Sequence, residues 1–73
     1  MTILVIGSSG YFAEILIKSL LKKKYKIIGV DLNKPIIFNK YYIHYQFCGT
    51  EYLKLKKLIK INKISKTAEI SLC

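Results

Sequence analysis

The sequence predicts an α/β fold in which parallel strands alternate with helices. Residues 2–6 and 26–31 are short apolar runs without alternation, the pattern of strands buried on both faces. Between them, residues 11–24 change to a helical period. The face expected to be buried comprises Phe12, Ile15, Leu16, Ser19 and Leu20, widened by Ile17 and Leu21. Strand, helix and strand within about 30 residues make one βαβ unit, expected to cross over right-handedly.

A glycine turn joins the first strand to the helix. Gly7 ends the apolar run, Gly10 precedes the helix, and Ala13 completes a Gly-x-x-Gly-x-x-Ala spacing. The first turn of a helix offers unpaired backbone N–H groups and the positive end of the helix dipole, so it suits a pyrophosphate. Asp31 ends the second strand, where a carboxylate can bind the ribose of the adenosine half. These features favour dinucleotide binding over the alternative, a generic βα turn with a solvated aspartate.

Asp31 also bears on the choice of cofactor. A carboxylate accepts hydrogen bonds from the free 2′-hydroxyl of NAD and repels the 2′-phosphate of NADP. Lys34 opposes this preference, since its charge would neutralise a phosphate. The Gly-Lys-Ser/Thr sequence of a P-loop is absent. NAD is therefore the expected cofactor and NADP the less favoured one.

The region from residue 36 to 73 gives weaker signals. Pro35 disfavours a helix at the residue before it, and Tyr41–Phe47 is expected to form a third strand. Only about nine residues separate the second and third strands, which is short for a helical crossover. A loop or a very short helix is therefore expected there. Thr50 is expected to cap a helix that reaches residue 62, and residues 69–73 to begin a fourth strand.

Length and composition narrow the class of protein. The 73 residues suffice for one small domain, and 52% of them are hydrophobic. These residues occur in runs too short for a membrane span or a signal peptide, so we expect a cytoplasmic protein. The two cysteines, Cys48 and Cys73, are too few for a disulfide framework, and free thiols are expected.

The basic charge opens an alternative function. The net charge is +9, and all 13 basic residues are lysine. Without the bidentate contacts of arginine, nucleic-acid binding is not favoured and a solvated surface is expected. The alternative is a small non-enzymatic module that binds an acidic partner, a nucleic acid or a membrane surface. Its surface would be residues 51–62, with lysines at positions 54, 56, 57 and 60.

The segment from Ile3 to Asn33 resembles the N-terminus of the extended short-chain dehydrogenase/reductases. This NAD-dependent epimerase/dehydratase family opens with Thr-Gly-x-x-Gly-x-x-Gly. The chain departs from that pattern at Ile6 and Ala13, and residues 47–50 lack the aspartate that the family carries near the adenine. The resemblance implies a Rossmann fold, NAD(P) and often a nucleotide-sugar substrate. It further implies that Gly7, Gly10, Tyr11 and Phe12 line the pyrophosphate, and that Asp31 and Asn33 face the ribose.

The sequence thus predicts one partial NAD(P)-binding Rossmann domain over residues 1–73, with its βαβ core at 2–31. Three to four parallel strands and flanking helices are expected. The family's catalytic Tyr-x-x-x-Lys is expected beyond this chain, because Tyr52 and Lys56 match its spacing but lie too early. No catalytic residue and no metal site are predicted, and His44 is expected to be packed or hydrogen-bonded. We expect that the chain comes from a truncated reading frame. Its sheet would then have an unpaired edge that is open to self-association.

Overall fold

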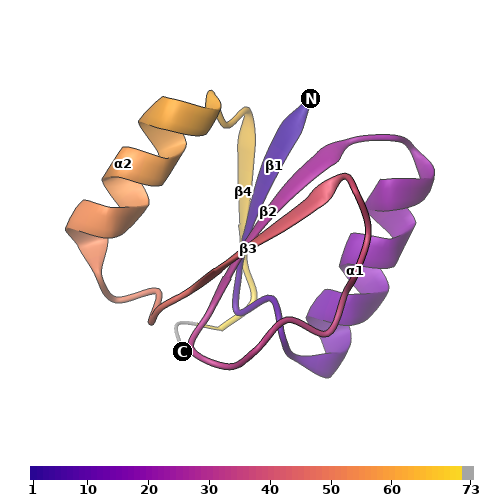
Figure 1. The fold of residues 1–73 in the computed structure, drawn as a ribbon, viewed down its shortest axis with the longest axis horizontal. Coiled ribbons are helices and arrows are strands. Elements are labelled where there is room, and N and C mark those ends of the chain that lie inside the picture. Colours follow the sequence, from indigo (N-terminus) through magenta and orange to yellow (C-terminus); the bar gives the residue numbers. More distant parts are fainter. Residues whose placement is uncertain (72–73) are drawn as a thin grey trace.

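Four parallel strands form one sheet with a helix on each face (Figure 1). This arrangement comes from a computed structural model, which describes residues 1–71. The elements in chain order are β1 (Thr2–Ile6), α1 (Tyr11–Lys22), β2 (Lys26–Asp31), β3 (Tyr42–Gln46), α2 (Tyr52–Asn62) and β4 (Lys66–Glu69). The predicted α/β class and parallel sheet are confirmed, and the architecture is that of a partial Rossmann fold.

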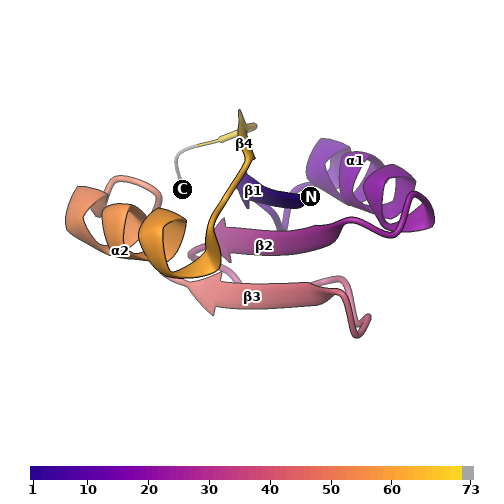
Figure 2. The same cartoon turned by 90° about the horizontal axis from the view of Figure 1, so that it is seen from above.

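The two apolar runs are the central strands. Neighbouring strands follow the order β3-β2-β1-β4, with Leu4 of β1 beside Ile28 of β2. Seen from above, α1 and α2 lie on opposite sides of the sheet (Figure 2). Both faces of β1 and β2 are therefore covered, which explains why their sequences do not alternate.

The core has two layers, one on each side of the sheet. The layer under α1 contains Ile3, Val5, Ala13, Ile17, Ile27, Ile37 and Tyr42. The layer under α2 contains Leu4, Ile6, Ile28, Val30 and Leu58. Successive residues of β1 alternate between the two layers, as the period of a strand requires.

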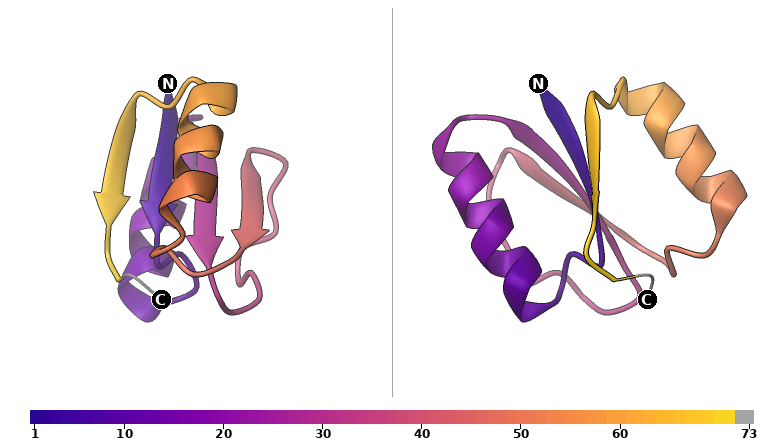
Figure 3. Two further views of the ribbon diagram at one scale, coloured as in Figure 1. Left: turned by 90° about the vertical axis from the view of Figure 1, so that its left-hand side faces the viewer. Right: turned by 180° about the vertical axis from the view of Figure 1, so that it is seen from behind.

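The strand order contains one reversal. The chain runs from β1 to β2 to β3 toward one edge and then returns to place β4 on the other side of β1 (Figure 3). In α/β proteins, ligands commonly bind at the carboxyl ends of the strands where the order reverses in this way. The glycine turn leaves β1 at this end of the sheet.

The buried face of α1 differs in part from the one expected, because Ile17 is buried and Leu20 and Leu21 pack against the core as predicted, but Phe12 and Ile15 do not. Ala13 and Ile17 are the buried residues of the helix, whereas Phe12 is 75% exposed and Ile15 is 53% exposed. A count of large apolar side chains therefore adds Phe12 and Ile15, which lie outside the buried face. The small Ala13 faces the sheet instead, and its lack of bulk lets the helix approach β1 closely.

The connection between β2 and β3 has no helix, so of the two predicted alternatives the loop is confirmed. Within it, Ile37 is 7% exposed and packs in the layer under α1. One apolar side chain thus fills part of the space that a crossover helix would cover.

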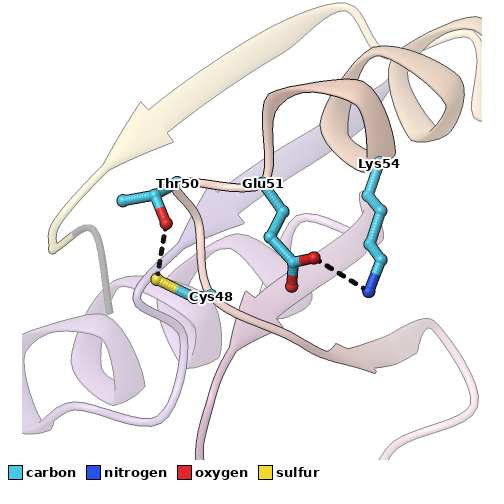
Figure 4. Close-up of polar contacts among 4 residues, drawn as sticks. All are labelled: Cys48, Thr50, Glu51 and Lys54. Carbon is cyan, nitrogen blue, oxygen red and sulfur yellow. Dashed lines mark hydrogen bonds and ion pairs between the residues drawn. The ribbon is translucent and has the colours of Figure 1, made fainter.

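The start of α2 also differs from the prediction. Glu51 is the N-cap and makes no capping hydrogen bond through its side chain. The Thr50 hydroxyl lies 3.0 Å from Cys48 Sγ, and Lys54 Nζ lies 3.1 Å from Glu51 Oε1 (Figure 4). Thr50 therefore lies one residue too early to be the N-cap. No cysteine within residues 1–71 is a free thiol, so that expectation is wrong for Cys48.

The fourth strand lies earlier than expected. Lys63 ends α2 in a left-handed conformation, and Ser65 N–H already donates to Thr2 O at 2.8 Å. β4 therefore occupies Lys66–Glu69 rather than residues 69–73, of which 72 and 73 lie outside the described residues. No helix within residues 1–71 is long and apolar enough to cross a membrane.

Candidate functional site

Three segments meet at the carboxyl edge of the sheet: the glycine turn, the loop after β2 and the segment after β4. The N–H of Gly7 donates to Val30 O at 2.7 Å, which ties the turn to the end of β2. The N–H of Ser71 donates to Ile6 O at 3.3 Å, which ties the end of β4 to β1. All four strands are parallel, so segments distant in the sequence converge at one edge.

Gly7 is required by the backbone and by packing. Its φ is +85°, a left-handed conformation that L side chains rarely adopt. A Cβ at this position would also lie 2.7 Å from the backbone nitrogen of Ser71. The first glycine of the motif therefore allows β1 to end in a tight turn under the segment that follows β4.

Gly10 has a different role, because none of the residues from 1 to 71 requires it to be glycine. It is the N-cap of α1 with φ −86°, and a Cβ there would meet only Gly7 O at 3.7 Å. Among the described residues, α1 begins its backbone bonds with Glu14 N–H to Gly10 O at 3.0 Å. Within residues 1–71, the amides of residues 11–13 therefore have no acceptor, and they lie beside an open approach at Gly10.

Tyr11 and Phe12 occupy the first turn of α1. Their side chains are 72% and 75% exposed. The two rings meet edge to face, with centroids 5.8 Å apart. The amides of this turn are thus bordered by two exposed aromatic rings next to a glycine.

Asp31 is buried, and its carboxylate bridges two segments. It is 5% exposed, Oδ2 accepts from Ser9 N–H at 3.0 Å, and Oδ1 accepts from Asn33 N–H at 2.8 Å. These bonds hold the glycine turn against the loop after β2. A carboxylate oxygen accepts more than one hydrogen bond, so acceptor capacity remains. The prediction from sequence gave Asp31 a ligand role and missed this bridging role.

The loop after β2 is held at three points. Besides the bond between Asn33 N–H and Asp31, the Asn33 carbonyl lies 3.0 Å from His44 Nε2, and Ser9 Oγ donates to Lys34 O at 2.6 Å. The side chain of Asn33 is exposed. The expectation that His44 is hydrogen-bonded is confirmed.

A buried polar cluster lies beneath this loop. Tyr42 Oη is 3.0 Å from His44 Nδ1, and Ser8 Oγ is 3.5 Å from the same nitrogen. Burial raises the pKa of Tyr42 above its ordinary value of 10.0, opposed by a hydrogen bond with Ser8 and supported by the charge of Asp31. The sequence contains one signal for the cluster. Gly29 lies inside β2, and a Cβ there would overlap the Tyr42 hydroxyl.

A second concave region lies away from the glycine turn. An apolar pocket of about 310 Å³ between β3 and α2 is lined by Tyr45, Phe47, Leu58 and Ile61, with Lys54, Lys57 and Asn62. Tyr52 and Lys56, the pair with catalytic spacing, are both exposed on α2. Within residues 1–71, no three His, Cys, Asp or Glu side chains are grouped to hold a metal ion.

Solved structures share this fold. A UDP-glucose 4-epimerase from Thermotoga maritima, solved with UDP-glucose, matches with a TM-score of 0.84 and 18% identity over 97% of this chain and 24% of its own. A dTDP-glucose 4,6-dehydratase from Bacillus anthracis, solved with NAD, matches with a TM-score of 0.87 and 21% identity over 97% and 26%. An L-threonine dehydrogenase from Cupriavidus necator matches with a TM-score of 0.81 and 18% identity over 97% and 23%.

These matches confirm the predicted similarity to an epimerase and a dehydratase as a likeness of fold. The chain spans about a quarter of the length of each of these three structures. No protein-family model and no curated protein sequence matches it. The residues that could hold a nucleotide are therefore judged on their own geometry.

Proposed function

We propose that this chain is the N-terminal, NAD-binding part of a cytoplasmic epimerase/dehydratase-like protein. One observation carries the proposal. Three backbone amides at the start of α1, without an acceptor among the described residues, border the open side of Gly10, and Asp31 lies at the same edge of the sheet. This combination suits a pyrophosphate linked to a ribose. The proposed domain covers residues 1–73, with residues 2–31 as its core.

In this proposal the pyrophosphate lies on the first turn of α1. Gly10 admits it because no side chain covers the amides, and Tyr11 and Phe12 border it. Asp31 accepts from the adenosine ribose with the lone pairs that its backbone bonds leave unused, and the exposed side chain of Asn33 faces the same ribose in this proposal.

NAD is the proposed cofactor in preference to NADP. A carboxylate at Asp31 accepts from the free 2′-hydroxyl of NAD and repels the 2′-phosphate of NADP. The backbone carbonyl of Lys34 accepts a hydrogen bond from Ser9 Oγ, and the Lys34 side chain is exposed. The positive charge of this side chain opposes the preference for NAD, since it would attract a 2′-phosphate.

The proposal gives this chain no reaction. Hydride transfer needs a residue that exchanges a proton with the substrate close to the nicotinamide. Tyr52 and Lys56 are exposed on α2, across the sheet from α1. Catalytic residues and a nucleotide-sugar substrate would belong to the remaining part of a longer protein.

The test compares two substitutions at Gly10 by calorimetric titration with NAD. Gly10→Ala adds a methyl group in ordinary van der Waals contact with Gly7 O at 3.7 Å, so we expect the fold and most of the affinity to remain. Gly10→Asp adds a negative charge beside the pyrophosphate, and a loss of at least about tenfold in affinity is expected, the equivalent of 1.4 kcal/mol. Circular dichroism checks that both variants stay folded.

The proposal fails if the unchanged chain shows no saturable NAD binding. It also fails if Gly10→Asp binds NAD as tightly as Gly10→Ala does.

A second candidate function is binding to an acidic partner through α2. The apolar pocket beside α2 is bordered by Lys54 and Lys57, and Lys56 and Lys60 are exposed on the same helix. Replacing these four lysines with glutamine should abolish salt-sensitive binding to anionic vesicles or nucleic acid if this candidate is correct. NAD binding should be unaffected by the same replacement.

A further inference from the structure

The cluster beneath the loop after β2 connects β1, β2 and the edge strand β3 on the α1 side of the sheet. Ser8 follows β1, Gly29 lies in β2, and Tyr42 and His44 lie in β3. His44 pairs with Gly29 in the strand register, and the Tyr42 ring reaches across β2 in the space that Gly29 leaves empty. The Tyr42 hydroxyl thereby arrives between His44 and Ser8.

The hydrogen-bond partners of His44 define its tautomer. The backbone carbonyl of Asn33 is only an acceptor, so His44 Nε2 must carry the proton that it donates at 3.0 Å. In the neutral ring Nδ1 is then an acceptor, and it receives the hydroxyl proton of Tyr42 at 3.0 Å. Tyr42 is thus the group that orients the ring toward Asn33.

Both backbone groups of Asn33 are therefore held by hydrogen bonds, one to Asp31 at the start of the loop and one to His44 outside it. The N–H donates to Asp31, and the carbonyl accepts from His44. The side chain of Asn33 is exposed, and the position of its Cα is set by the two hydrogen bonds of its backbone. A loop that lacks regular structure is thereby given one position at the carboxyl edge.

We propose that His44, oriented by Tyr42, is a positioning residue that holds the loop of residues 31–34 in place for the adenosine half of the dinucleotide. This inference rests on the proposed NAD-binding function and deepens it. His44 does not touch the ligand. It acts through the Asn33 carbonyl and lowers the ordering cost that the loop would otherwise incur on binding.

The test uses a matched pair of substitutions in the whole chain. His44→Gln places an amide N–H near the position of Nε2, so the bond to the Asn33 carbonyl is retained. His44→Asn is shorter and keeps only the contact with Tyr42. We expect His44→Gln to bind ADP-ribose within about twofold of the unchanged chain, and His44→Asn to bind it about threefold to tenfold more weakly, as the loss of one hydrogen bond implies.

Inorganic pyrophosphate separates positioning from general damage. It uses the first turn of α1 and not the loop of residues 31–34, so its affinity should be the same in both variants. Amide hydrogen exchange without ligand gives an independent readout. The Asn33 N–H should exchange faster in His44→Asn than in His44→Gln, while amides of β1 remain equally protected.

The outcomes are distinct. If the unchanged chain binds neither ADP-ribose nor pyrophosphate, the proposed function fails and this inference fails with it. If it binds ADP-ribose and the two variants are indistinguishable in affinity and in Asn33 exchange, only the positioning role is overturned. Equal weakening of pyrophosphate and ADP-ribose in His44→Asn would also overturn it, since the defect would then not be confined to the loop.

Discussion

Two residues of β2, Asp31 and Gly29, each contribute both to the local fold and to the candidate site. Asp31 is both the carboxylate proposed to bind ribose and the acceptor that links Ser9 to Asn33. Gly29 is a strand residue whose missing side chain makes room for the Tyr42 hydroxyl. In both cases the local fold and the candidate site depend on the same atoms, so a loss of binding in a variant has to be compared with its stability.

At Tyr42 the structure predicts a dependence of stability on pH. Its pKa in the folded chain is raised above 10.0, so the unfolded chain releases this proton first. The contribution to stability is fully present below about pH 10 and is lost as the pH rises through the folded-state pKa. Urea unfolding between pH 8 and 11 should therefore show a steeper fall in the free energy of unfolding for the unchanged chain than for Tyr42→Phe.

The Tyr42→Phe comparison removes the contributions of other groups that titrate in this range. The chain contains 13 lysines and six tyrosines, and all except Tyr42 are present in both proteins. Identical slopes for the two proteins would show that Tyr42 is not desolvated in the folded state.

At the level of the element, the small residue Ala13 determines which face of α1 packs against the sheet. Ala13 and Ile17 are both fully buried, while the larger Phe12 and Ile15 are exposed. The helix carries apolar side chains on more than one face, so its sequence leaves the orientation undetermined. Contact with β1 and β2 selects the face that approaches the sheet most closely.

The matched pair Ile17→Ala and Ile15→Ala tests this orientation. Ile17 is fully buried, so its truncation should cost about 2–5 kcal/mol of unfolding free energy. Ile15 is 53% exposed, and the same truncation there should change stability by less than about 1 kcal/mol. Urea unfolding measures both. A larger loss for Ile15→Ala would show that Ile15, as first expected from the sequence, lies on the buried face.

At the scale of the whole molecule, the sheet has two open edges among the described residues, β3 and β4. In β4, Lys66, Thr67 and Glu69 are exposed, and only Ala68 is partly buried. An edge strand offers unpaired backbone groups to another chain. The net charge of +9 opposes association at low ionic strength.

Self-association through β4 is therefore predicted to appear when the charge is screened. At about 150 mM salt, where the Debye length is about 8 Å, the average mass in sedimentation equilibrium should rise with protein concentration. Thr67→Lys places a charge on the edge and should reduce this rise. Ser19→Lys adds the same charge on an exposed position of α1 and should not. Equal effects of the two variants would exclude β4 as the contact.

The candidate site was predictable from sequence only in part. Gly7 and Gly10 are close in the chain, so their spacing indicates a turn before a helix, and the structure has that turn. The polar cluster joins Ser8 to His44 across 36 positions, and no local pattern reports such a contact. Gly29 was the one residue in the sequence that indicated the cluster, because a glycine inside a buried strand often marks a place where another group approaches the backbone closely.

By itself the sequence determined the α/β class, the parallel βαβ unit and the glycine turn, because each depends on hydrophobic period and on backbone freedom over short distances. Tertiary structure alone decided which face of α1 is buried, where β4 begins and what Asp31 and His44 hold. Those outcomes depend on which strands become neighbours, and the pairing of β1 with both β2 and β4 brings together residues that lie far apart in the chain.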